Sequence, residues 1–176
     1  MATISEEAVR EIGSPLGPLR LRPERAEDDG FRFTLFCQSR TSDFAQLSLD
    51  AAALEQLMRF QFQGQTLSYR ANFPDADFDI IEFDGAPIGR IVVDRSDSAL
   101  HLVDQALTPA LRGRGLGNAI MTALLHEAAG NALPVRLSVD PGNAAALRLY
   151  RRLGFVPIRT DLHAIAMEWR ANDEAS

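Results

Sequence analysis

The sequence predicts one α/β (α+β) domain in which strands and helices share a single core. Its 176 residues suit one domain, since domains of roughly 100 to 200 residues are the commonest. Hydrophobic residues make up 46% and charged residues 24% of the chain, a balance typical of a soluble globular protein. The pair Asp84-Gly85 stands between two apolar runs and predicts an antiparallel hairpin. Apolar residues at helical spacing that end at Gly130 predict an amphipathic helix.

The other expected elements follow from periodicity and from the residues that begin or end a segment. Residues 1–18 lack a clean period, so we predict a loose leader, a domain over 19–170 and a tail over 171–176. Asp50 and Asn143 are predicted N-caps, and Gly154 is a predicted helix stop. The predicted strands are 19–22, 79–83, 87–94, 100–107, 135–139, 155–161 and 164–169, and the predicted helices are 26–38, 50–69, 116–130 and 143–154.

Composition excludes several classes of mechanism. All 18 basic residues are arginine, and the absence of lysine excludes a Walker-type phosphate loop and Schiff-base chemistry. The single cysteine, Cys37, cannot form an intramolecular disulfide and is expected to be a packed residue. His101, His126 and His163 have no zinc-like spacing, so no metal is expected. An acidic N-terminus without an apolar run, and no later apolar window of about 18 residues, predict a cytoplasmic protein without membrane contact.

The charge is unevenly distributed along the chain. The formal net charge is -6, yet residues 112–152 carry six arginines against two carboxylates, a local +4, while the remainder carries -10. The acidic total and the absence of interleaved aromatic residues argue against a nucleic-acid partner. The arginine segment predicts instead a small anionic ligand.

A glycine-rich loop lies inside that arginine segment, where a predicted strand meets a predicted helix. Its sequence is Arg112-Gly113-Arg114-Gly115-Leu116-Gly117-Asn118. The first turn of a helix leaves about four N–H groups free for an anion. Glycines allow close approach and positive φ, and arginines form forked hydrogen bonds with phosphate oxygens. The spacing is not that of a dinucleotide-binding fold. A merely flexible turn is the alternative, but it leaves the two arginines unexplained.

A second motif lies on the helix predicted after Asn143. Asn143, Ala146 and Tyr150 are three and four residues apart, so they form one stripe of that helix. A phenol pKa of about 10 is only about 1.5 units above that of a thiol, so Tyr150 could protonate a thiolate at modest cost. The alternative is that Tyr150 packs in the core beside Leu147 and Leu153.

Together the two motifs resemble the GCN5-related N-acetyltransferase (GNAT) family over about residues 19–169. Residues Arg112 to Gly117 match the family signature R/Q-x-x-G-x-G/A, which cradles the pyrophosphate of acetyl-CoA. Leu107 resembles the strand end whose backbone pairs with the pantetheine arm. By the same resemblance, Asn143 corresponds to an asparagine that contacts the cofactor, and Tyr150 to the tyrosine that protonates the leaving thiolate.

The resemblance implies a fold, an activity and a set of site residues. The fold is a single-domain GNAT-like fold, with a central mixed, mostly antiparallel sheet of about six to seven strands flanked by about four helices. The activity is acetyl transfer from acetyl-CoA, without a metal, to a small-molecule or peptide amine by direct attack in a ternary complex. A non-catalytic acyl-CoA-binding sensor or partner-binding module is the alternative, and a homodimer is left open. Tyr150 is the implied catalytic residue, and the implied cofactor-binding residues are Leu107, Arg112, Gly113, Arg114, Gly115, Leu116, Gly117, Asn118, Asn143 and Ala146.

The attacking amine needs a base, because an alkylamine with a pKa of about 10.4 is mostly protonated at neutral pH. The candidates are Asp104, Glu82 and His101, each acting directly or through water. Simple strand alternation places His101, Val103, Gln105 and Leu107 on one face and Leu102, Asp104 and Ala106 on the other. At most one of His101 and Asp104 is therefore expected in the cleft.

The acceptor site is expected between residues 31–69 and the turn near Asn72-Phe73-Pro74. Phe60, Phe62, Tyr69 and Phe73 form either an apolar wall of that site or part of the core. The excess of acidic residues outside 112–152 favours a cationic amine as the acceptor.

Overall fold

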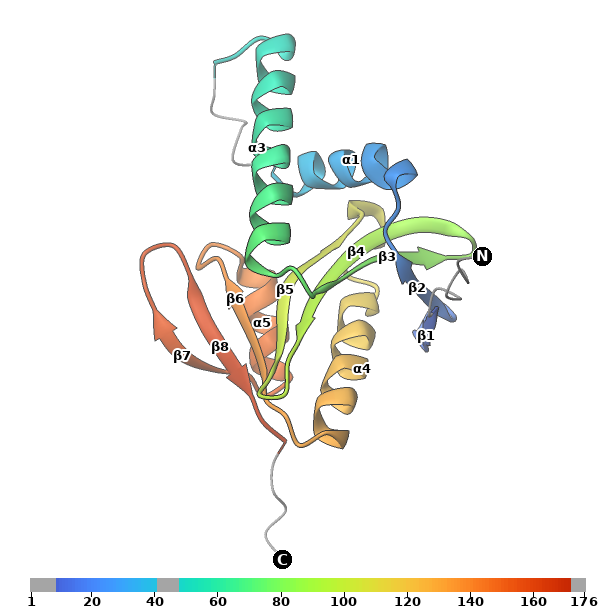
Figure 1. Ribbon diagram of the computed structural model, residues 1–176, viewed down its shortest axis with the longest axis vertical. Coiled ribbons are helices and arrows are strands. Elements are labelled where there is room, and N and C mark those ends of the chain that lie inside the picture. Colours follow the sequence, from blue (N-terminus) through green and yellow to red (C-terminus); the bar gives the residue numbers. More distant parts are fainter. Residues whose placement is uncertain (1–8, 41–47, 172–176) are drawn as a thin grey trace, which may run out of the picture.

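The computed structural model describes residues 9–40 and 48–171, and over these residues the strands form one sheet in the order β1-β2-β3-β4-β5-β6-β8-β7 (Figure 1). All neighbouring strands are antiparallel except β5 and β6, which are parallel. The predicted mixed, mostly antiparallel sheet is confirmed, with eight strands where about six to seven were expected. The strands are β1 (Arg10–Ile12), β2 (Leu19–Pro23), β3 (Asp77–Phe83), β4 (Ala86–Arg95), β5 (Leu100–Leu107), β6 (Val135–Val139), β7 (Val156–Thr160) and β8 (Ile165–Trp169).

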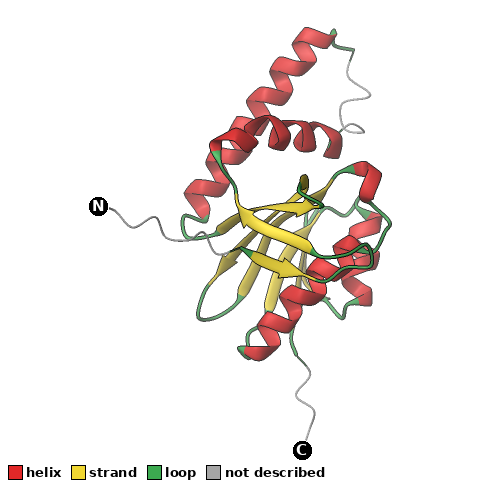
Figure 2. Cartoon of the chain, turned by 90° about the vertical axis from the view of Figure 1, so that its right-hand side faces the viewer, coloured by secondary structure: helices red, strands yellow, loops and turns green. Residues whose placement is uncertain are grey.

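The helices lie on both faces of this sheet (Figure 2). The described residues include α1 (Asp29–Ser39), α3 (Ala51–Asn72), α4 (Leu116–Gly130), α5 (Ala144–Arg152) and two short 3-10 turns, η1 (Ala26–Asp28) and η2 (Pro109–Leu111). Helices α1 and α3 pack together on one face, whereas α4 and α5 contribute to the main core on the other. The predicted cap of α3 is confirmed, since Asp50 Oδ1 accepts a hydrogen bond from the Ala53 amide at 2.8 Å.

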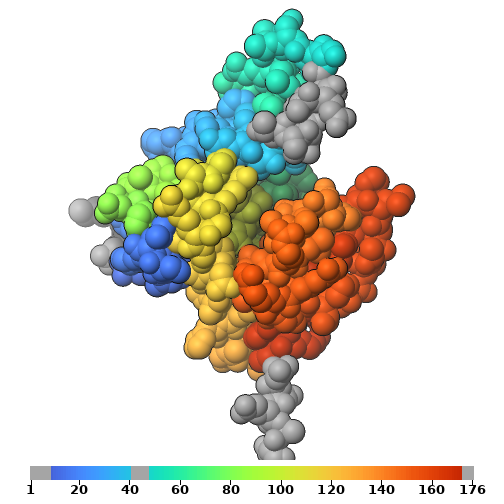
Figure 3. Space-filling view, turned by 180° about the vertical axis from the view of Figure 1, so that it is seen from behind, coloured from blue at the N-terminus to red at the C-terminus, as the bar shows by residue number. Residues whose placement is uncertain are grey.

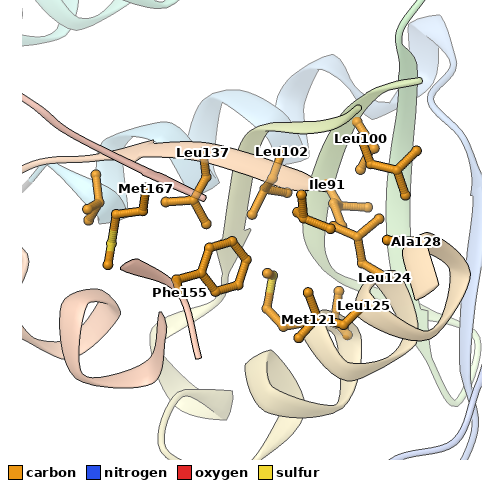
Figure 4. Close-up of a cluster of buried hydrophobic side chains, with 14 of the residues drawn as sticks. Ile91, Leu100, Leu102, Met121, Leu124, Leu125, Ala128, Leu137, Phe155 and Met167 are labelled. Atoms are coloured by element: carbon orange, nitrogen blue, oxygen red, sulfur yellow. The ribbon is translucent and has the colours of Figure 1, made fainter. Parts of the chain in front are cut away.

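The main core explains why the helical periodicity of α4 is so clear in the sequence. The apolar stripe of α4, which includes Leu116, Ile120 and Met121, is almost fully buried. It packs against alternate residues of β4, β5, β6 and β8 and against Phe155, as the close-up in Figure 4 shows. Burial of such side chains contributes about 1.5 to 3 kcal/mol each, so this face anchors the strands that form the site.

The prediction of a loose leader is wrong for residues 10–12. These residues form β1, which pairs with β2, and Arg10 makes an ion pair with Asp79. Ser14 then closes a turn with its hydroxyl donating to the Gly17 carbonyl at 2.6 Å. A strand of three residues is too short to show a period, and its stabilising contacts come from distant parts of the chain. Residues 1–8 and 172–176 of the predicted leader and tail lie outside the described residues.

Helix α3 contains a glycine that helix stability does not require. Gly64 lies in mid-helix, and a Cβ added there meets no atom within 4 Å. Gly64→Ala is therefore expected to raise the free energy of unfolding by about 0.5 to 1 kcal/mol, as measured by urea denaturation. Gly89→Ala is the matched control and should destabilise, because its Cβ would lie 2.5 Å from the Ala106 carbonyl oxygen. A destabilised Gly64→Ala protein would contradict this account of α3.

Candidate active site

Strands β5 and β6 run together for only a short distance and then diverge. Their parallel pairing joins Leu100, His101 and Leu102 to residues 135–137, while β5 continues to Leu107. Beyond Leu102, the side of β5 that faces β6 has no strand partner among the described residues, so its backbone polar groups are available to a ligand. A cavity of about 150 Å³ lies in this divergence. Figure 3 shows the surface hollowed here, between the yellow and the orange segments.

A β-bulge at Val103 sets which side chains enter the site. Val93 pairs with Leu102 and Val92 pairs with Asp104, so Val103 has no opposite residue on β4. One extra residue shifts the alternation of every side chain that follows it. The predicted alternation of β5 is therefore wrong after Leu102.

The bulge places His101 and Asp104 on the same face of the sheet, contrary to prediction. The His101 ring packs edge-on against Phe73 with centroids 5.2 Å apart, and Arg90 Nη1 donates to Asp104 Oδ2 at 3.3 Å. Both contacts lie on the face covered by α1 and α3. Gln105 turns instead toward Gly117 at the start of α4.

The glycine-rich loop adopts the positive φ angles that its glycines allow. Gly113 and Gly115 have φ values of 72° and 81°, in the left-handed region that favours glycine. Gly115 is the N-cap of α4, and its carbonyl accepts the first helical hydrogen bond, from Ala119, at 3.0 Å. The amides of the first α4 turn therefore have no helical partner, and the helix dipole adds positive potential there.

The side chains of the glycine-rich loop lie in different environments. Arg112 Nε donates to the Leu107 carbonyl at 3.0 Å, which ties the loop to the end of β5 and occupies that carbonyl. Leu116 is 1% exposed, so only its backbone faces a ligand. Arg114 is exposed. Asn118 lines a separate hollow beside residues 11–13, so its side chain lies away from the β5–β6 divergence.

The stripe predicted on α5 borders the divergence. Asn143 Oδ1 caps the helix by accepting from the Ala146 amide at 3.1 Å, and Asn143, Ala146 and Tyr150 all line the smaller cavity. The Tyr150 ring lies 5.6 Å from that of Phe155, so Tyr150 both packs and faces the cavity. Its hydroxyl has no hydrogen-bond partner within the described part of the chain. Burial, with the negative charge of Asp104, raises the pKa of Tyr150 to about 12.

Of the three candidate bases, Asp104 is the one that lines the cavities. It borders both the smaller cavity and a larger one of about 680 Å³, whereas Glu82 and His101 border neither. Glu82 instead accepts a hydrogen bond from Arg22 Nε at 2.7 Å. Burial raises the pKa of Asp104, although Arg90 opposes that rise. Burial lowers the pKa of His101, which keeps it neutral against Phe73.

The predicted aromatic wall divides into separate environments. Phe62 and Tyr69 line the larger cavity, whereas Phe60 is 74% exposed and Phe73 contacts His101. Cys37 is half-buried, and burial raises the pKa of its thiol. Three further residues of the larger cavity were not expected from the sequence: Arg32, Arg40 and Arg90. They lie on α1, directly after it and on β4, which come together only in the folded protein.

The model of the acetyltransferase (GNAT) family matches residues 45–155, which is more than half of the chain. This chain belongs to the GNAT family. The match spans the glycine-rich loop, the β5–β6 divergence and α5, so the features described above lie within the GNAT part of the chain.

Curated relatives of this GNAT chain include mycothiol acetyltransferases. That of Streptomyces coelicolor is 32% identical over 163 residues, covering 88% of this chain and 52% of the relative. That of Mycobacteroides abscessus is 50% identical over 54 residues, covering 30% of this chain and 18% of the relative. The GNAT chain thus spans about half the length of the Streptomyces relative.

Solved structures confirm the GNAT fold. The PaiA N-acetyltransferase of Thermoplasma acidophilum, in complex with coenzyme A, aligns with a TM-score of 0.65 and 19% identity over 87% of this chain and 99% of its own. RimJ of Mycobacterium smegmatis, in complex with CoA-disulfide, aligns with a TM-score of 0.63 and 15% identity over 96% of this chain and 89% of its own. At these identities the likeness concerns the fold.

Within residues 9–40 and 48–171, no three His, Cys, Asp or Glu side chains gather as ligands for a metal ion. In the same ranges, no helix has the length and apolar character needed to span a bilayer.

Proposed function

We propose that this GNAT protein transfers the acetyl group of acetyl-CoA to the nitrogen of a small-molecule or peptide amine. One observation carries the proposal: the β5–β6 divergence lies between the start of α4, whose first amides have no helical partner, and a cavity lined by Asp104 and Tyr150. A long molecule with phosphates at one end and a thioester at the other matches this arrangement.

The residues around the divergence fit the parts of acetyl-CoA. The amides that follow Gly115 and the guanidinium groups of Arg112 and Arg114 suit the pyrophosphate. The pantetheine arm has amides of its own, so it would pair with the free side of β5 as an added strand does. The Asn143 side-chain amide, whose oxygen caps α5, still has N–H donors for the arm.

The proposed reaction forms one bond and breaks another. The amine nitrogen attacks the thioester carbonyl carbon, the N–C bond forms, the C–S bond breaks, and the sulfur leaves as a thiolate. Asp104 accepts the proton of the amine, directly or through water, which its raised pKa favours. Tyr150 donates a hydrogen bond to the sulfur.

The pKa of Tyr150 defines how it assists the thiolate. At about 12, it exceeds that of a free thiol by about 3.5 units, so complete proton transfer costs about 5 kcal/mol. This cost is larger than the one expected from the ordinary pKa of a tyrosine. Tyr150 therefore stabilises the leaving sulfur mainly as a neutral hydrogen-bond donor, and it remains protonated over the whole physiological pH range.

The role of Asp104 predicts a specific pH profile. With an acceptor amine of low pKa, kcat/KM should fall as the pH drops through the raised pKa of Asp104, because the protonated carboxyl accepts no proton. Asp104→Asn should lower kcat/KM by about 100-fold and remove that acidic limb. No alkaline loss is expected below about pH 10, since Tyr150 stays protonated. Glu82→Gln is the control, and an unchanged profile in Asp104→Asn would assign the proton to another acceptor.

A thiol-release assay across a panel of amines tests the proposal. Acetyl-CoA is incubated with this chain and each amine, and the free thiol is measured with a colorimetric reagent. Amine-dependent release supports transfer. Tight binding of acetyl-CoA without release by any amine would favour the non-catalytic sensor.

A further inference from the structure

The part of the larger cavity between α1, α3 and β4, which we call the acceptor end, is rich in arginine. Arg32, Arg40 and Arg90 line it. Among the described residues, Asp104 is the carboxylate at this end, since Asp140, which also lines the cavity, follows the end of β6. Arg40 covers the Phe36 ring at 4.7 Å. A net positive cavity concentrates anions, because the surrounding protein screens charge less than water does.

Glu24 is a buried carboxylate outside the cavity lining, and several arginines share it. Glu24, with a side chain 3% exposed, lies 3.1 Å from Arg90 Nε and 3.3 Å from Arg32 Nε, and it also pairs with Arg70. Asp29 lies 3.7 Å from Arg32, but it is 66% exposed. Within the described residues, Glu24 and Asp29 therefore offset only part of the positive charge of this cluster.

Two buried guanidinium nitrogens in the cluster are unsatisfied. Arg90 Nη2 makes no hydrogen bond within the described part of the chain, and Arg32 Nε makes none there either, although Glu24 lies 3.3 Å from it as an ion-pair partner. The side chains of Arg90 and Arg32 are 6% and 9% exposed. An unpaired buried donor on a charged group is costly and uncommon. Burial lowers the pKa of Arg32, attraction to Glu24 and Asp29 opposes that fall, and repulsion from Arg90 and Arg70 adds to it. Among the described residues, Glu24, Asp29 and Asp104 offset three of the four charges on Arg32, Arg40, Arg70 and Arg90, which leaves a surplus of one positive charge.

In the acceptor end, an arginine lies next to the proposed proton acceptor. Arg90 Nη1 lies 3.3 Å from Asp104 Oδ2, which places an anion-attracting group beside the proposed proton acceptor. Leu35, Phe36 and Phe62 line the same end, with the two rings 5.6 Å apart. A ligand with an amine, an anionic group close to it and an apolar portion complements these three features.

We propose that the acceptor is an amine of the amino-acid class, whose carboxylate is held by Arg32, Arg40 and Arg90 while its amine faces Asp104. This inference rests on the proposed function and names its substrate class. It replaces the cationic amine expected from the charge of the chain, because the carboxylates that make the total negative lie mostly outside the acceptor end. Guanidinium forks match the two oxygens of a carboxylate.

Matched acceptor pairs test the inference. L-leucine, L-phenylalanine and L-glutamate are each compared with their α-amides in the thiol-release assay, with kcat/KM expressed per unprotonated amine. In the pair with the highest activity, kcat/KM for the free acid should exceed kcat/KM for the amide by about tenfold or more. Arg40→Gln should move that ratio toward one. Arg59→Gln, on an exposed arginine of α3 outside the cavity, should leave the ratio unchanged.

A binding measurement separates this inference from the proposed function. N-acetyl-L-phenylalanine and its amide are titrated into the protein with coenzyme A present, followed by calorimetry, and the acid should bind more tightly in the wild type but not in Arg40→Gln. Equal or better use of amides, or a tenfold preference for phosphoethanolamine, would overturn the carboxylate assignment while leaving acetyl transfer intact. If none of the amines tested caused thiol release, the proposed function would be overturned instead.

Discussion

Gly115→Asp is expected to abolish acetyl-CoA binding, weakening it by about 100-fold or more. Gly115 has φ of 81°, and a Cβ there would lie 3.1 Å from Pro15 Cγ, so any side chain strains both the loop and its contact with the N-terminal segment. The new carboxylate would also stand at the helix start, where it would repel the pyrophosphate. Isothermal titration calorimetry with acetyl-CoA measures the loss.

Two controls separate the effect on binding from an effect on folding. Gly64→Asp makes the same chemical change on an exposed part of α3 and should bind acetyl-CoA normally. Gly113→Ala, at φ of 72° with no atom within 4 Å of its Cβ, tests backbone strain without a clash or a charge and should weaken binding less. A folded Gly115→Asp protein that binds acetyl-CoA as well as the wild type would contradict the proposal that this loop binds the pyrophosphate.

Tyr150→Phe is expected to lower kcat by about 100-fold while leaving the affinity for acetyl-CoA nearly unchanged. The substitution removes the hydroxyl but keeps the ring that lies 5.6 Å from Phe155, so the packing of α5 should persist. Pre-steady-state thiol release and a separate binding titration give the two quantities.

The two measurements distinguish the roles that Tyr150 can have. Reduced turnover with intact binding means that the hydroxyl assists departure of the sulfur. Turnover equal to that of the wild type would return Tyr150 to a packing role. Parallel loss of binding and turnover would mean that the hydroxyl supports the cavity rather than the reaction.

Local signals in the sequence predicted most of the fold. Asp84 and Gly85 have φ of 52° and 78°, as the hairpin turn requires, and Asp50 and Asn143 cap their helices as expected. Strand 135–139 has the predicted bounds. These features depend on neighbouring residues, which is why the sequence reveals them.

Features that depend on distant contacts were not predictable from the sequence. The bulge at Val103 arises from the register of β5 on β4. A valine at this position does not indicate a bulge in the sequence. The bulge places Asp104 on the same face of the sheet as His101. The arginines of the acceptor end likewise come from α1, the residue that follows it and β4, so the net charge of the chain does not reveal them.

The most direct test of the account is the stoichiometry of transfer. Wild-type protein, acetyl-CoA and the best amino-acid acceptor are incubated together, and mass spectrometry of the acetylated amine is compared with the free thiol released. The account predicts one acetylated amine for each thiol, with both products strongly reduced in Tyr150→Phe. Acetyl-CoA binding at the β5–β6 divergence without any acetylated amine from the panel would contradict it.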